Sequence, residues 1–202
     1  MSKPDQPLDW IANWQRVARR IRVPLGFLVA ALYVFELWRR TPSPRAMAWS
    51  LILVVPGLWL RGYASGYVKK NQELTTTGPY AHVRNPLYLG SILMAAGFAV
   101  ALESWVVGAA LAVMFVAIYV PVIASEERFL RVAFPGFGEY CSRVPRLIPR
   151  LTAARTPGDD RQGRFFLPLY RKHREYNALL GVVLLYLALL FLKPLLNLLL
   201  HR

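Results

Sequence analysis

Two polar clusters hold the side chains of this sequence that could do chemistry. The first, residues 76–90, reads TTGPYAHVRNPLYLG and places Tyr80, His82 and Arg84 between a Gly-Pro turn and an apolar segment. Pro86 suits the first position of a helix, because it lacks the N–H that would have no partner there. The free N–H groups of such a helix start favour a carboxylate or another anion. The first cluster therefore predicts a turn that binds an anionic group at the edge of an apolar helix.

The second cluster, residues 126–146, begins with Glu126 and Glu127 directly after an apolar segment and ends with Arg143 and Arg146. An unpaired carboxylate near the membrane boundary is costly, so a functional role is a reasonable default. A solvated helix end is the other interpretation of the glutamate pair. We expect the two clusters to lie on one face of a membrane and to form one site.

Apolar and charged residues must be segregated along this chain. Hydrophobic residues make up 55% of the 202 residues, yet charged residues still make up 18%, which requires blocks of each kind. A membrane-spanning helix needs roughly 17 to 25 apolar residues. The sequence therefore predicts an all-α integral membrane bundle of about five transmembrane helices, at residues 23–38, 46–60 or 46–67, 86–102, 105–124, and 177–192 or 177–200.

Residues 8–21 show a helical pattern of a different kind. Trp14 and Ile21 belong to an apolar set that recurs at helical spacing, with arginines between its members. This pattern is typical of an amphipathic helix in the headgroup region. A signal peptide is the competing interpretation, but Arg39 and Arg40 stand where a small-residue cleavage site should be. The predicted parts are an interfacial helix (1–22), a membrane core (23–150), a linker with an interfacial segment (151–175) and an additional C-terminal transmembrane helix (176–202).

The net charge of +14 lies mainly in segments that flank the apolar blocks. No groove-reading or base-stacking motif accompanies these residues, so we expect membrane lipids rather than nucleic acid as partners. The positive-inside rule places the N-terminus, residues 69–85 and residues 125–175 in the cytoplasm and the Glu103 turn outside. The arginines of residues 39–45 conflict with this assignment. Cys141, the only cysteine, is expected to serve in packing, and no metal site is expected.

The motifs of the two clusters also occur together in a known family. The combination of TTTGPYAHVRNPLYLG, a helical hairpin, EERFL, FGEY and VPRLIP resembles the core of the isoprenylcysteine carboxyl methyltransferase family and its relatives, the phospholipid methyltransferases. The resemblance covers about residues 66–150. It implies an integral membrane enzyme that binds S-adenosylmethionine from the cytosol and methylates a lipophilic, membrane-embedded acceptor. In a bacterium this would be an inner-membrane protein whose active site faces the cytoplasm.

The same resemblance implies roles for individual residues. The family's usual histidine in its RHP motif is Asn85 here, and Asn can form hydrogen bonds but cannot transfer a proton. The cofactor does not sit on a Rossmann domain, in agreement with the absence of a GxGxxG motif. The resemblance implies cofactor contacts by Pro79, Tyr80, Val83, Arg84, Asn85, Tyr88, Leu89 and Tyr140, to which we add His82, and it implies catalytic roles for Glu126, Glu127 and Arg146, to which we add Arg143.

The acceptor decides which of these catalytic groups is needed. An isoprenylcysteine-like carboxylate needs a cation to position it, for which Arg143 or Arg146 would serve, whereas an amine needs a glutamate to take or relay a proton. We expect Glu127 and Arg146 to form the acceptor-side pair. Two alternatives stay open: a phospholipid or lipid-amine N-methyltransferase, and a non-catalytic membrane protein that keeps the fold, for which Asn85 is the best argument. The oligomeric state is not encoded in these motifs.

Overall fold

The structure is a computed structural model that describes residues 9–69, 73–154 and 163–200. These residues form helices joined by loops, which confirms the predicted all-α class. A 3₁₀ turn, η1, and a π-helical turn, η2, accompany the α-helices. In chain order the elements are α1 Asp9–Arg39, α2 Pro44–Ser65, η1 Gly78–Ala81, α3 Pro86–Ala101, α4 Trp105–Met114, η2 Phe115–Tyr119, α5 Val120–Ala133, α6 Phe137–Arg143, α7 Leu167–Lys172 and α8 Tyr176–Leu200.

Three helical stretches of the described chain are long and apolar enough to cross a membrane. They are Arg20–Arg39, Pro44–Ser65 and Trp105–Ala133, the last being the continuous path through α4, η2 and α5. Two shorter apolar helices, Pro86–Ala101 and Tyr176–Leu192, complete the set. The predicted apolar segments therefore correspond to helices, and the chain has the architecture of an integral membrane protein.

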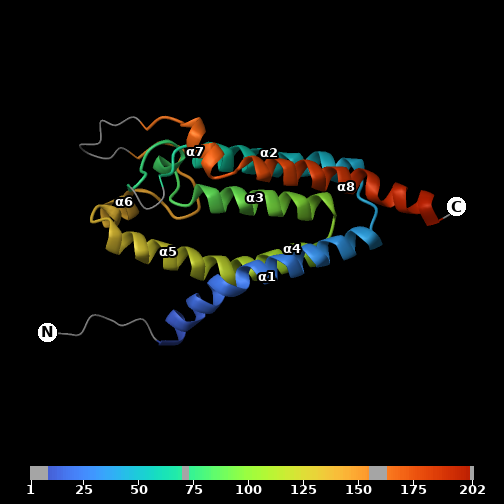
Figure 1. The fold of residues 1–202 in the computed structure, drawn as a ribbon, viewed down its shortest axis with the longest axis horizontal. Helices are drawn as coiled ribbons and strands as arrows, with labels where there is room; N and C mark the ends of the chain where they lie inside the picture. The colour runs from blue at the N-terminus through green and yellow to red at the C-terminus, as the bar shows by residue number, and fades with distance from the viewer. Residues whose placement is uncertain (1–8, 70–72, 155–162, 201–202) are drawn as a thin grey trace.

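The helices form two layers (Figure 1). Helices α2, α3 and α8 lie side by side in one layer, and α1 runs along α4 and α5 in the other. At one end of the bundle lie the loop between α2 and α3, the end of α5, and α6 and α7; the connections α1–α2 and α3–α4 lie at the opposite end. The segments that the sequence predicts to share one membrane face are thus at one end, away from the Glu103 turn.

The opposite end is fastened by a buried carboxylate. Glu36 of α1 is 3% exposed and accepts hydrogen bonds of 2.8 Å from Arg40 and from Ser104, which precedes α4. Arg40 also donates to the backbone carbonyl of Glu103 at 2.9 Å. The charge of Arg40, one of those that conflict with the positive-inside rule, is therefore used to join two interhelical turns.

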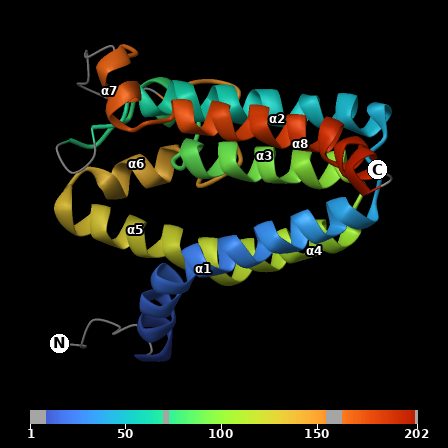
Figure 2. The same cartoon turned by 45° about the vertical axis from the view of Figure 1, so that its right-hand side comes forward.

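Helix α1 is continuous through residues that the sequence divides into an interfacial helix and a span. Pro24 lies inside it, where a missing N–H and the proline ring favour a bend, and its first turns diverge from the bundle (Figure 2). Trp14 nevertheless contacts the bundle, because its indole N–H donates to the Ala117 carbonyl in η2 at 3.0 Å. The prediction for residues 1–8 falls outside the described residues.

Helices α2 and α3 approach closely enough that only glycine fits between them. A Cβ added at Gly57 would lie 2.7 Å from the Gly90 carbonyl oxygen, and one added at Gly90 would lie 2.6 Å from the Gly57 carbonyl oxygen. Small residues at facing positions are a usual way for helices in membranes to pack. This contact brings the end of α2 next to the start of α3, which matters for the site described below. Of the predicted linker and interfacial segment, residues 151–175, the stretch 155–162 lies outside the described residues.

Candidate functional site

The two polar clusters meet at one end of the bundle, as the sequence predicts. The segment after η1 runs along the segment after α6, so that residues 40 or more positions apart in the chain are neighbours. Three backbone hydrogen bonds of 2.9 Å join them: from the N–H of Arg84 to the carbonyl of Pro145, from Arg150 to His82, and from Ala154 to Ala81.

Two buried tyrosines strengthen this junction. The hydroxyl of Tyr140, on α6, donates to the backbone carbonyl of Tyr80 at 2.7 Å. Burial raises the pKa of both tyrosines above the usual value, with smaller contributions from Glu175 near Tyr80 and from Tyr80 near Tyr140. Both phenols are therefore neutral at physiological pH, and Tyr140 acts as a hydrogen-bond donor.

Local backbone chemistry explains the shape of the first cluster. Gly78 has φ +60, a conformation that glycine adopts without strain, and it opens the turn η1. Pro86 is the first residue of α3, as predicted from its missing N–H. Asn85 occupies the position before it, but its side chain caps no helical N–H. That side chain is used in the second cluster instead.

Glu127 is the centre of an ionic network that joins the clusters. Its carboxylate, 7% exposed, forms a salt bridge of 2.7 Å with Arg146 and one of 3.4 Å with Arg84. Asn85 donates to the same carboxylate at 3.1 Å and to the Arg146 carbonyl at 3.2 Å. Arg84 also donates to the sulfur of Cys141 at 2.8 Å. Glu127 and Arg146 thus form an ion pair, and the Glu127 carboxylate is fully engaged by protein groups.

A cavity of about 540 Å³ lies beside this network. Glu126, adjacent to Glu127 in the chain, faces the cavity and accepts a hydrogen bond of 2.9 Å from the hydroxyl of Tyr88. The walls combine charged groups with rings and aliphatic side chains. They comprise Arg22, Arg61, Glu73, Leu74, Thr75, Tyr80, Arg84, Leu87, Tyr88, Ser91, Tyr119, Glu126, Phe129, Leu130, Phe134, Phe137, Tyr140 and Glu175.

Two buried polar atoms in this wall have no hydrogen-bond partner within the described chain. They are the hydroxyl oxygen of Thr75 and Nε of Arg84, and both residues line the cavity. A buried polar atom left without a partner costs free energy on the order of 1–3 kcal/mol. Such atoms are usually satisfied by a ligand or by water.

Some of the other predicted site residues line the polar cavity and the rest lie outside its lining. Tyr80, Arg84, Tyr88 and Tyr140, four of the predicted cofactor-binding residues, line the cavity. Arg143 forms a salt bridge of 3.4 Å with Glu139 on α6. The described residues that line the cavity do not include Pro79, His82, Val83, Asn85, Leu89, Glu127, Arg143 or Arg146.

An ionic pair that the two sequence motifs do not contain lies in the same wall. Arg61, near the end of α2, donates from Nε and Nη2 to both carboxylate oxygens of Glu175 at 2.9–3.1 Å. Its remaining nitrogen, Nη1, donates to the hydroxyl of Ser91 and to the Leu87 carbonyl. An arginine inside an apolar block was the available signal, because a charge in a span is costly without a partner. No sequence pattern indicated Glu175 as that partner.

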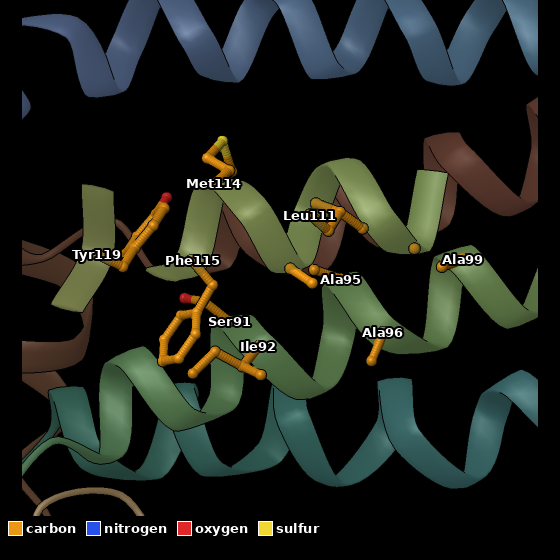
Figure 3. Close-up of a pocket in the computed structure, with 11 residues that line it drawn as sticks. Ser91, Ile92, Ala95, Ala96, Ala99, Leu111, Met114, Phe115 and Tyr119 are labelled. Carbon is orange, nitrogen blue, oxygen red and sulfur yellow. The ribbon is translucent and has the colours of Figure 1, made fainter. Parts of the chain in front are cut away.

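A second, apolar cavity adjoins the first. It has a volume of about 470 Å³ and lies between α3 and the rod formed by α4 and η2. Figure 3 shows Ala95 of α3 next to the side chain of Leu111, and Ile92 of α3 next to that of Phe115. We call it the apolar slot. Ser91 and Tyr119 line both cavities, so the polar cavity and the apolar slot meet at these two residues.

Fold and site together define a helical membrane protein with a polar cavity at one end and an apolar slot between its helices. Comparison with known proteins agrees with this class: residues 46–136 match the phospholipid methyltransferase family. No solved structure shows a significant match.

Two curated relatives are similar to this chain. One is the cobalt-zinc-cadmium resistance protein CzcN of Cupriavidus metallidurans, 39% identical over 140 residues, which are 66% of this chain and 64% of the relative. The other is the nickel-cobalt-cadmium resistance protein NccN of Alcaligenes xylosoxydans xylosoxydans, 40% identical over 99 residues, which are 49% of this chain and 46% of the relative. The chain thus spans less than two thirds of the length of either relative. Within its described residues there is no group of three or more His, Cys, Asp or Glu side chains that could hold a metal ion.

Proposed function

We propose that this protein is an S-adenosylmethionine-dependent membrane methyltransferase that acts on a lipophilic acceptor. The observation that carries the proposal is the junction of the polar cavity with the apolar slot at Ser91 and Tyr119. A polar donor and an acceptor with an apolar tail could meet there without leaving the protein. The match of residues 46–136 to a methyltransferase family supports the same activity. The basic segments at this end favour a cytoplasmic orientation.

The residues of the polar cavity fit S-adenosylmethionine. A volume of about 540 Å³ lies in the range of roughly 300–1,000 Å³ usual for small-molecule sites. The unpartnered Nε of Arg84 and hydroxyl of Thr75 offer hydrogen bonds to the polar parts of the ligand. Tyr80, Phe134 and Phe137 supply rings for its adenine, and the Glu126 carboxylate supplies the charge opposite to its sulfonium.

The chain's contribution to methyl transfer is alignment and the exclusion of water. The bound cofactor would supply an electrophilic methyl group, which the acceptor takes in line with the sulfur that leaves with the electron pair. Glu127 keeps Arg84 and Asn85 in place through its network, so we assign it a positioning role. Glu126 faces the cavity with Tyr88 and is the carboxylate that would contact the reactants.

The size and lining of the apolar slot favour an apolar chain. Its volume of about 470 Å³ lies in the range of roughly 300–1,000 Å³ usual for small-molecule sites, and its lining is almost wholly apolar. An isoprenoid or fatty chain bearing a small polar head fits such a slot.

An amine acceptor is the second candidate, and one observation favours it. Glu126 lines the polar cavity, whereas Arg143 and Arg146, the two arginines expected to position a carboxylate acceptor, are not among its described lining residues, which do include Arg22, Arg61 and Arg84. A carboxylate at this place suits removal of a proton from an amine before methyl transfer.

The test combines binding with product analysis. We expect calorimetry on the purified full chain in lipid nanodiscs to show saturable binding of S-adenosylhomocysteine. Methyl-labelled S-adenosylmethionine should then transfer label to a total membrane lipid extract. Label lost in mild base would indicate a carboxyl ester, and label that resists base would indicate an amine. Absence of binding at millimolar ligand would favour a non-catalytic protein that keeps the fold.

A blocking substitution tests the role of the apolar slot. A Cβ added at Gly108, which lines the slot, meets no atom within 4 Å, so Gly108→Phe places a ring there without a clash at Cβ. We expect label transfer to fall at least tenfold while S-adenosylhomocysteine still binds. Gly181→Phe, on α8 and equally free of contacts at Cβ, is the matched control and should keep wild-type transfer.

A further inference from the structure

We propose that Arg61, held by Glu175, positions Ser91 so that this serine binds the polar head of the acceptor. This inference rests on the proposed methyltransferase function and names the part of the site that selects the second substrate. It assigns a role to residues that lie outside the two sequence motifs, and in Glu175 to a residue beyond the 46–136 region that matches the methyltransferase family.

Ser91 lies where the two cavities meet. Ser91 of α3 and Tyr119 of η2 are the residues that line both the polar cavity and the apolar slot. Ser91 lies among the residues of the slot in Figure 3. An amphiphile with its tail in the slot and its reacting head in the polar cavity must pass between these two residues, so their hydroxyls are within reach of its head.

Two hydrogen bonds fix the orientation of Ser91. Its hydroxyl donates to the Leu87 carbonyl at 2.9 Å and accepts a hydrogen bond from Nη1 of Arg61. These two bonds fix the direction of the remaining lone pair on the hydroxyl oxygen. A hydrogen-bond acceptor with a fixed direction favours a substrate head group that can donate a hydrogen bond, such as a hydroxyl, an amine or a protonated acid.

Glu175 holds the guanidinium of Arg61. All three guanidinium nitrogens donate hydrogen bonds, two of them to Glu175 in a bidentate pair. The side chains of Arg61 and Glu175 are 23% and 11% exposed. A buried ion pair is often no more stabilising than an apolar pair of similar volume, so stability alone gives little reason to keep one in the wall of a cavity. Holding the Arg61 guanidinium rigidly against Ser91 gives such a reason.

Glu175 connects the turn before α8 to the end of α2. This residue lies between α7 and α8 and reaches the end of α2 through Arg61. The C-terminal helix is therefore tied to the acceptor end of the site, and the turn before α8 completes a wall that residues 46–136 begin.

Variants of the pair should separate acceptor binding from cofactor binding. We would measure three quantities in nanodiscs: the dissociation constant of S-adenosylhomocysteine, the amount of membrane lipid extract that gives half-maximal label transfer, and the midpoint of thermal unfolding. For Glu175→Gln we expect the half-saturating lipid to rise about tenfold and the dissociation constant to change less than about twofold. For Ser91→Ala we expect a rise of about threefold with an unchanged unfolding midpoint.

The control is the ionic pair at the other end of the bundle. Glu36 and Arg40 also join two elements through a buried carboxylate, so Glu36→Gln removes a comparable contact far from the site. It should lower the unfolding midpoint without changing half-saturation by lipid. Equal effects of Glu36→Gln and Glu175→Gln on half-saturation would show that the Arg61 pair is only structural.

Two other outcomes would overturn the inference. A parallel rise in the S-adenosylhomocysteine dissociation constant for Glu175→Gln would assign the pair to the cofactor instead. Wild-type half-saturation in Ser91→Ala would remove Ser91 from acceptor binding, even if Glu175→Gln fails to fold. Failure of the methyltransferase proposal itself would look different, because the unmodified protein would then neither bind S-adenosylhomocysteine nor transfer label.

Discussion

The same substitution at the adjacent residues Glu126 and Glu127 should change two different properties: ligand binding for Glu126 and stability for Glu127. Glu127 is 7% exposed and bonds to Arg84, Asn85 and Arg146. Glu126 faces the polar cavity and bonds to the hydroxyl of Tyr88. Replacing each carboxylate by the amide of glutamine keeps the shape of the side chain and removes its charge. We therefore expect Glu127→Gln to lower stability and Glu126→Gln to lower ligand binding.

The expected loss of stability follows from the partners of Glu127. Hydrogen bonds to charged groups contribute about 1.5–3 kcal/mol, and Arg84, whose side chain is 14% exposed, would lose the carboxylate that balances its charge. The bond to Arg146 counts for at most about 1 kcal/mol, because that side chain is 45% exposed. The sum is about 3 kcal/mol, which lowers the unfolding midpoint by roughly 6–12 °C in a chain of this size.

For Glu126→Gln the amide oxygen still accepts the hydrogen bond from Tyr88. We expect a change in stability under about 1 kcal/mol, or at most about 4 °C. The loss of negative charge beside a sulfonium should weaken S-adenosylmethionine more than the uncharged S-adenosylhomocysteine. That preference separates an electrostatic effect from a change in shape.

The assay is thermal unfolding in nanodiscs together with calorimetry of both ligands. Equal unfolding midpoints for the two variants, or a lower midpoint for Glu126→Gln, would refute the assignment of Glu127 to the network and Glu126 to the cavity. Equal weakening of both ligands by Glu126→Gln would refute its proximity to the sulfonium.

Three further predictions concern other parts of the structure. Thr75→Val should weaken the binding of S-adenosylhomocysteine about fivefold, the equivalent of about 1 kcal/mol, without lowering the unfolding midpoint, because the Thr75 hydroxyl has no hydrogen-bond partner among the described residues; unchanged affinity by calorimetry would remove it from the site. Gly90→Val should cost about 1–3 kcal/mol in thermal unfolding, because its Cβ would lie 2.6 Å from the Gly57 carbonyl oxygen, and Gly26→Val, where a Cβ meets no atom within 4 Å, should cost less. Burial and the hydrogen bond with Tyr63 raise the pKa of Tyr67 from 10.0 to about 12. Stability should therefore fall as pH rises from 10 to 12, because the unfolded state loses this proton first. Tyr67→Phe should make that fall shallower in a pH series of unfolding midpoints, and an equally steep fall would contradict the assignment.

Elements that depend on local composition were predictable. The apolar blocks, the stop at Arg39 and the helix start at Pro86 follow from hydropathy and from the missing N–H of proline, and the described helices confirm them. The meeting of the two clusters was also predictable, because a helical hairpin returns the chain to the membrane face from which it left. The backbone hydrogen bond between Arg84 and Pro145 confirms that meeting.

The sequence by itself determined an all-helical membrane protein and the end of the bundle at which its polar residues gather. Only the tertiary structure decided which of two adjacent glutamates faces the cavity, because consecutive residues on α5 point about 100° apart and the rotation of the helix is set by its packing against α1. It also decided the pairing of Arg61 with Glu175, 114 positions apart. Local patterns carry no information about such a contact, since it depends on where α8 lies against α2 and on the close approach of α2 and α3 at Gly57 and Gly90.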